Sequence, residues 1–129
     1  MATILVVDDD ANNRELLKTI LSHAGHNVVE AADGVEGLRL VTELQPDLAI
    51  VDLRLPRLSG TELIKQVRSG RNLARVRLAL YTATRSDAAM EQFTELYGVA
   101  RTIPKPSEPA EVIAIVSAIL ASDDPADRA

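Results

Sequence analysis

The hydrophobic residues of this chain form short continuous runs that alternate with longer segments of helical periodicity. The runs at 4–7 and 48–52 each contain four consecutive apolar residues, several of them β-branched, and each is followed or ended by an acidic residue. Such runs are typical of strands in a parallel sheet, which helices cover on both faces. Three weaker runs, at 27–31, 76–81 and 100–103, predict further strands. The least apolar run, 27–31, and the run before Pro104 are expected at the sheet edges.

Apolar residues at helical spacing predict five helices, one after each strand. We expect them near residues 12–24, 33–44, 59–67, 86–97 and 108–120. Three of them start with the capping-box pattern of a polar residue followed three positions later by Glu, namely Asn12/Glu15, Asp33/Glu36 and Ser59/Glu62. Asp10 is an alternative cap for the first helix, Ser86 or Asp87 suits the fourth, and Ser107 is interpreted as a cap of the fifth.

The strict alternation of strand and helix predicts an α/β fold, in which right-handed crossovers build a parallel sheet with helices on both faces. A doubly wound (βα)5 domain of this size most simply has strand order 2-1-3-4-5. We expect one domain over residues 1–121. Residues 122–129 are polar and are interpreted as a C-terminal tail or the start of a linker.

Composition narrows the class of protein. The chain has 129 residues, a net charge of -5, no cysteine and three aromatic residues. The negative charge and the scarcity of aromatic side chains argue against direct binding of nucleic acid. The absence of cysteine, of a long apolar segment and of a signal peptide before the first strand leads us to expect a cytoplasmic protein with no membrane association.

Five chemically active residues follow the predicted strands: Asp8, Asp9, Asp52, Thr82 and Lys105. The carboxyl ends of parallel strands share one crevice, so we expect these side chains to converge there. Clustered carboxylates need a neutralising partner, and Mg²⁺ characteristically takes a few carboxylates, water and a substrate phosphate. A lysine and a hydroxyl supply a positive charge and a donor for a phosphoryl group. The set predicts phosphoryl transfer onto a carboxylate, with Asp52 as the nucleophile.

Over about residues 2–121 the chain resembles the response-regulator receiver domains of two-component signalling. Four motifs, in the family's order, carry this resemblance: Ile4-Leu5-Val6-Val7-Asp8-Asp9-Asp10, Asp52 with Pro56 and Gly60, Tyr81-Thr82-Ala83, and Lys105-Pro106. The resemblance implies a flavodoxin-like, CheY-like fold. It also implies a signalling protein whose only catalysis is its own phosphorylation and dephosphorylation.

The resemblance further implies a role for each site residue. Asp52 would accept phosphate from a sensor histidine kinase or a histidine phosphotransfer protein. Asp8, Asp9, Asp52 and the backbone carbonyl of Arg54 would bind Mg²⁺ or Mn²⁺. Lys105 would pair with the phosphoryl oxygens, and Thr82 would form a hydrogen bond to them. The bond between Lys105 and Pro106 would be cis and would direct Lys105 into the site.

Several positions modulate or depart from the family's pattern. Thr102, three residues before the lysine, replaces the usual aromatic residue, so this chain lacks the ring that the usual coupling between the threonine and an aromatic rotamer requires. Arg54 and Thr84, two residues after Asp52 and Thr82, flank the phosphoryl group in the family and influence its lifetime. For Arg54 a solvated side chain is an equal alternative. Ser107 also stands where the family often has an aromatic residue.

The family's readout surface corresponds here to about residues 86–121. Its partners would be a downstream target protein or an output domain, and the same surface is a possible homodimer interface. The sequence leaves open whether the chain is a stand-alone regulator or part of a larger protein. Asp33 and Asp47 are interpreted as cap and turn residues, and His23 and His26 as surface residues far from the crevice.

Two other functions stay open. A pseudo-receiver would keep the fold for protein interaction without phosphorylation, which Thr102 favours and the intact set of five site residues opposes. A haloacid-dehalogenase-type phosphatase would use Asp8 as nucleophile and Asp10 as acid/base. It would need an acidic pair at another strand end and a cap over the site, whereas this chain has only Asp52 there.

Overall fold

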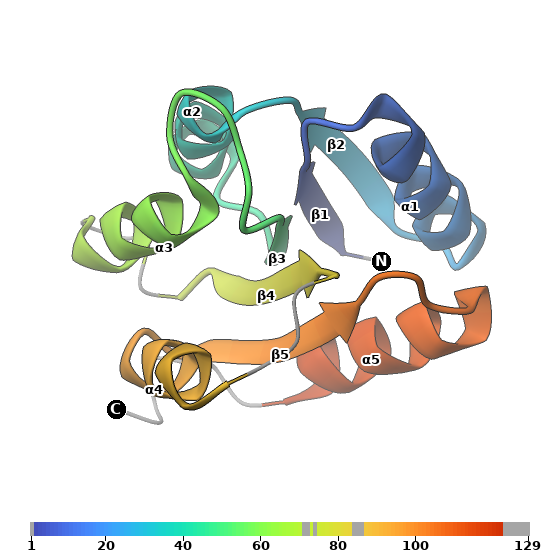
Figure 1. The fold of residues 1–129 in the computed structure, drawn as a ribbon. Helices are drawn as coiled ribbons and strands as arrows, with labels where there is room; N and C mark the ends of the chain where they lie inside the picture. Colours follow the sequence, from blue (N-terminus) through green and yellow to red (C-terminus); the bar gives the residue numbers. More distant parts are fainter. Residues whose placement is uncertain (1, 71–72, 74, 84–86, 123–129) are drawn as a thin grey trace.

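The computed structural model describes residues 2–70, 73, 75–83 and 87–122. Within them, five parallel strands form one sheet in the order β2-β1-β3-β4-β5, which confirms the predicted topology (Figure 1). The strands are β1 (Thr3–Val7), β2 (Asn27–Ala31), β3 (Leu48–Val51), β4 (Arg77–Thr82) and β5 (Val99–Pro104). The helices are α1 (Ala11–His23), α2 (Gly34–Leu44), α3 (Gly60–Ser69), α4 (Ala88–Leu96) and α5 (Pro109–Ala121).

The helices cover both faces of the sheet, so the molecule has three layers (Figure 1). On one face α1 and α5 pack against alternate strand residues such as Ile4 and Ile50. On the other face α2, α3 and α4 pack against the intervening residues, such as Leu5 and Val51. The residues of β1 from Ile4 to Val7 and all residues of β3 are buried on both faces of the sheet, which explains their unbroken apolar runs.

The strand boundaries differ by a residue or so from the predicted ones. β3 ends at Val51, and Asp52 is the first residue after it, although the Asp52 N–H still donates to Val7 O at 2.9 Å. β4 runs one residue later than predicted and includes Thr82, whereas β5 is longer at both ends. Strand ends depend on backbone pairing with neighbours, which side-chain patterns report only indirectly.

Two predicted helix caps are wrong. α1 begins at Ala11 and is capped by Asp10, whose carboxylate accepts from the Asn12 N–H at 2.8 Å. Asp10 was the alternative to Asn12. It is the cap because its extended backbone brings its carboxylate to the first free N–H groups of the helix. Ser107 does not cap α5: its hydroxyl donates to Pro104 O instead, and the N-cap is Glu108 without a side-chain cap bond.

The other predicted caps are confirmed where they are described. Asp33 caps α2, Ser59 caps α3 and Asp87 caps α4, each by accepting from the N–H three residues later. Ser86, the other candidate for α4, lies outside the described residues. Gly25 follows the C-cap of α1 with φ +96°, a backbone conformation that glycine adopts without strain. Within the described part of the chain, no helix combines the length and hydropathy required to cross a membrane.

Candidate functional site

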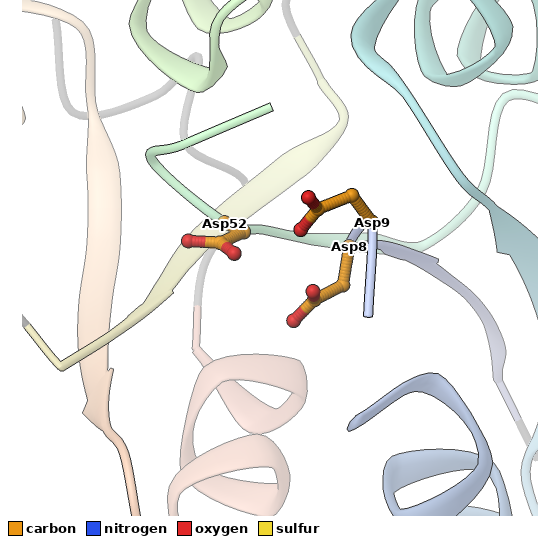
Figure 2. A group of neighbouring side chains, drawn as sticks. All are labelled: Asp8, Asp9 and Asp52. Carbon is orange, nitrogen blue, oxygen red and sulfur yellow. The ribbon is translucent and has the colours of Figure 1, made fainter. Parts of the chain in front are cut away.

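Three carboxylates meet where β1 and β3 end. Asp8 and Asp9 directly follow β1, Asp52 directly follows β3, and these two strands are hydrogen-bonded neighbours. Figure 2 shows the three side chains gathered at this edge of the sheet. One oxygen from each lies within 4.8 Å of the others. Asp8 is 1% exposed and Asp52 8%, whereas Asp9 is exposed to solvent. The predicted convergence of the acidic residues is therefore observed.

Lys105, which directly follows β5, places its ammonium group between two of these carboxylates. Its Nζ lies 2.9 Å from Asp8 Oδ2 and 3.1 Å from Asp52 Oδ2, and its side chain is 17% exposed. Partial burial alone would lower the pKa of Lys105, but the hydrogen bonds and charges of the two aspartates outweigh burial and raise this pKa above its ordinary value. The lysine is therefore a firmly held cation at neutral pH.

Backbone groups hold the second oxygen of each buried carboxylate. The Asp10 N–H donates to Asp8 Oδ1 at 2.9 Å, and the Arg54 N–H donates to Asp52 Oδ1 at 3.3 Å. The loop after Asp52 packs so closely on α3 that a Cβ at Gly60 would lie 2.1 Å from Asp52 O. Only glycine fits at position 60, which explains physically why the motif that contains Asp52 also contains Gly60.

The structure adds two residues that the sequence did not indicate. Asn13 Nδ2 donates to Asp8 Oδ2 at 3.3 Å, so it shares this oxygen with Lys105. Arg14 Nη1 donates to Asp8 O at 2.8 Å, while its Nε donates to Glu30 on β2 at 3.2 Å. Both come from the first turn of α1, and together they fix the position of Asp8. An asparagine and an arginine at a helix start carry no sequence signal for this role.

Thr82 and Arg54 complete the rim of the same pocket. Thr82, the last residue of β4, is 4% exposed. The described residues that line this pocket are Asp8, Asp9, Asp10, Asn13, Asp52, Arg54, Thr82, Ala83 and Lys105. All predicted metal-binding and phosphoryl-binding residues are among them, so the tertiary structure brings the predicted set together.

The remaining predicted positions lie elsewhere or are not described. Thr102 pairs with Leu80 within the sheet and is not among the residues that line the pocket. Thr84 lies outside the described residues. The peptide bond between Lys105 and Pro106 is cis, in agreement with the expectation from the resemblance.

The residues interpreted as structural do lie away from the pocket. Asp33 caps α2 and also accepts from Arg57 at 3.2 Å. Its pKa is lowered, first by the Glu36 N–H and then also by the charge of Arg57. Asp47, at the opposite end of β3, accepts from the Thr3 N–H at 2.8 Å. His26 accepts from the Ala2 N–H at that end too, and His23 closes α1.

The donor set fits a hard divalent cation. Three carboxylates carry three negative charges, and Lys105 neutralises one of them, so the cluster keeps an excess of about two negative charges. All the side chains of the cluster are oxygen donors, with no imidazole or thiolate that would favour zinc or copper. The pocket thus combines a cation site, a lysine and a buried hydroxyl at one opening. This combination suits the binding and transfer of a phosphoryl group.

Comparisons with known proteins agree with this chemistry. The family described as "Response regulator receiver domain" matches residues 4–117. The response regulator MprA of Mycobacterium leprae is 37% identical over 127 residues, which is 98% of this chain and 54% of that protein. The chain spans about half the length of the curated relatives it matches.

Solved structures show the same architecture. A putative response regulator from Chloroflexus aurantiacus has a TM-score of 0.85 and 34% identity, with 94% of this chain and 98% of that chain covered. The receiver domain of a sensor histidine kinase from Pseudomonas aeruginosa has a TM-score of 0.84 and 26% identity, with 94% and 98% covered. That structure has a magnesium ion coordinated in its active-site cleft.

Proposed function

The chain belongs to the response regulator receiver domain family of two-component signalling, and we propose that it is a phosphorylation-controlled switch whose phosphoacceptor is Asp52. The observation that carries the proposal is the position of Asp52. Its carboxylate lies at the pocket edge, within 4.8 Å of two further acids and 3.1 Å from the Lys105 ammonium. Among the clustered acids, Asp52 alone directly follows the central strand β3.

In the proposed reaction, a carboxylate oxygen of Asp52 attacks the phosphorus of a phosphohistidine on a sensor kinase or a phosphotransfer protein. The new P–O bond forms as the donor's P–N bond breaks, and the electrons of that bond stay on the imidazole nitrogen. Lys105 then pairs with a phosphoryl oxygen, and the Thr82 hydroxyl donates to another. Arg54 lines the same pocket, which supports a role for its side chain in limiting the access of attacking water.

Asp8, Asp9, Asp52 and the Arg54 backbone carbonyl would hold Mg²⁺, or Mn²⁺ in its place. The bound cation would neutralise charge that develops on the phosphoryl oxygens. The chain's own residues prepare the site: Asn13 and the Asp10 N–H orient Asp8, and the Arg54 N–H orients Asp52. Lys105 reduces the repulsion between Asp8 and Asp52 before the cation binds.

Phosphorylation would bias an equilibrium between two forms of the surface built by α4, β5 and α5. The target would be a downstream protein or an output domain, and the surface would also serve a homodimer. Residues 1–121 would form the receiver, with 122–129 as a tail or the start of a linker. A phosphohistidine donor of this class acts in the cytoplasm, where we place the protein.

The test is intact mass after incubation with Mg²⁺ and a small acyl phosphate. We expect one added phosphoryl group, which a chelator and Asp52→Ala each abolish. Asp47→Ala is the matched control, because it removes a carboxylate from the other end of β3 and leaves the pocket intact.

An adduct that survives Asp52→Ala would refute Asp52 as the acceptor. If no adduct forms, binding of beryllofluoride, a phosphoryl mimic, separates a poor donor from an inert site. Failure of both would favour the pseudo-receiver, a protein that keeps the fold for protein interaction alone.

A further inference from the structure

The ring of Tyr81 lies beside the ammonium group of Lys105, although the proposed reaction gives Tyr81 no part. Lys105 Nζ lies over the ring, 4.8 Å from its centre. Tyr81 is 4% exposed and packs in the core cluster on the α1 and α5 face of the sheet. The face of an aromatic ring attracts a cation, most strongly where water is excluded. The contact is therefore a third attraction on the lysine, besides its two ion pairs.

The Tyr81 ring differs from the two carboxylates because neither cation binding nor phosphorylation involves it. Asp8 and Asp52 are both assigned to the cation, and Asp52 also becomes phosphorylated, so their contacts with Lys105 change. An aromatic ring is not a ligand for a hard cation, and phosphorylation leaves it unaltered. Of these three contacts, only the one with Tyr81 can stay the same before and after the reaction.

We propose that Tyr81 is a positioning residue for Lys105, whose ring face keeps the ammonium group at the pocket when the carboxylates are taken up by the cation and the phosphoryl group. Lysine has a flexible four-carbon stem, and a lysine free to leave the pocket would meet the phosphoryl oxygens less often. The consequence for the reaction rests on the proposed function, whereas the contact itself does not. A simple core-filling role for Tyr81 is the alternative that the experiments must exclude.

The first experiment detects the contact by NMR without any phosphorylation. The chain has three lysines, Lys18, Lys65 and Lys105. Protein labelled with ¹³C at the lysine Cε therefore gives three signals, and the signal that disappears in Lys105→Met belongs to Lys105. We expect Tyr81→Leu to remove the ring-current shift of the Lys105 signal in metal-free and in Mg²⁺-loaded protein, and Tyr81→Phe to keep it. A Lys105 signal that is identical in Tyr81→Leu and the unmutated protein refutes the proposal.

The second experiment measures the rate of phosphorylation by the acyl phosphate. We expect Tyr81→Leu to slow it about tenfold, the size of one partly desolvated cation–π contact, and Tyr81→Phe to restore most of it. In a Lys105→Met background, Tyr81→Leu should cause little further loss, because the contact it removes no longer exists. Equal losses in both backgrounds would assign Tyr81 a structural role only and would overturn the proposal.

Two controls keep these outcomes distinct. Tyr97→Leu removes the chain's other tyrosine ring, which packs on Phe93 rather than near the pocket, and should leave the rate unchanged. If Tyr81→Leu does not fold, Tyr81→Met replaces it, because methionine adapts to irregular core spaces. If the unmutated protein neither takes up phosphate nor binds beryllofluoride, the proposed function fails, whereas the NMR experiment still decides whether the ring holds Lys105.

Discussion

Asp9 carries a charge that opposes folding, and Asp9→Asn should therefore stabilise the metal-free protein. One Asp9 oxygen lies within 4.8 Å of oxygens on Asp8 and Asp52. Within the described part of the chain, its carboxylate has no hydrogen bond or ion pair to offset this repulsion. Asp8 and Asp52 instead share Lys105. Asp9 is thus the acid of this cluster whose negative charge is least stabilised by contacts in the folded protein.

The size of the effect follows from the distance and the exposure. Two unit charges 4.8 Å apart repel by about 0.9 kcal/mol in water and by about 3.5 kcal/mol at an effective dielectric constant of 20. Asp9 is exposed, so the lower value applies to each of its two pairs. Attraction to Lys105 cancels part of the sum. We expect Asp9→Asn to raise the free energy of unfolding by about 1 kcal/mol at neutral pH and low ionic strength.

The assay is urea unfolding in a chelator and then in excess Mg²⁺. In the chelator the variant should unfold at a higher urea concentration than the unmutated protein, with the same m-value. Mg²⁺ should stabilise the unmutated protein more, because it binds the three-carboxylate site more tightly, so the difference should shrink or reverse. The control is Asp10→Asn, since asparagine caps a helix as well as aspartate does.

Either of two results would refute this reasoning. One is a variant less stable than the unmutated protein in the chelator, which would mean that the Asp9 carboxylate makes a favourable interaction. The other is equal stabilisation of both proteins by Mg²⁺, which would mean that Asp9 is not a ligand.

Three further substitutions test other parts of the structure. Asp33→Asn should lower the free energy of unfolding at neutral pH, because it removes the charge that interacts with Arg57. The folded-state pKa of Asp33 is below 3.8, so the difference should fade as the pH falls from that value through the folded pKa. Urea unfolding at several pH values measures this. Gly60→Ala should cost about 3 kcal/mol and slow phosphorylation, because its Cβ would meet Asp52 O. Arg68 donates to three carbonyl oxygens at 2.6, 2.7 and 3.0 Å. Arg68→Ala should lower the free energy of unfolding by about 2–3 kcal/mol in thermal or urea denaturation, and Arg68→Lys should recover only part of it.

The architecture was predictable because each strand and helix has its own local signal. The runs at 4–7 and 48–52 required a sheet covered on both faces, and the alternating helices left few possible topologies. The caps Asp33 and Ser59 were equally local, since a cap and its partner lie three residues apart. The choice between Asp10 and Asn12 was harder, because both residue types cap helices well and only the path of the backbone after β1 decides.

The polar residues that surround the acids were less predictable. Asn13, Arg14 and Tyr81 are ordinary residues for a helix start or a strand, and each acquires its role from a contact with a residue outside its own helix or strand. Arg14 joins Asp8 to Glu30 on β2, and Tyr81 lies under a lysine that follows β5. No periodicity or motif records such contacts, which depend on side-chain directions in the packed molecule.

The sequence by itself therefore determined the strand order and the meeting of Asp8, Asp9, Asp52 and Lys105 at one edge of the sheet. It could do so because parallel strands all end at the same edge, whatever the details of packing. Only the tertiary structure decided which acids Lys105 neutralises, which acid is left without a partner, and which ring supports the ammonium group. Those outcomes depend on distances of a few ångströms between side chains that folding brings together from as far apart as residues 8 and 105.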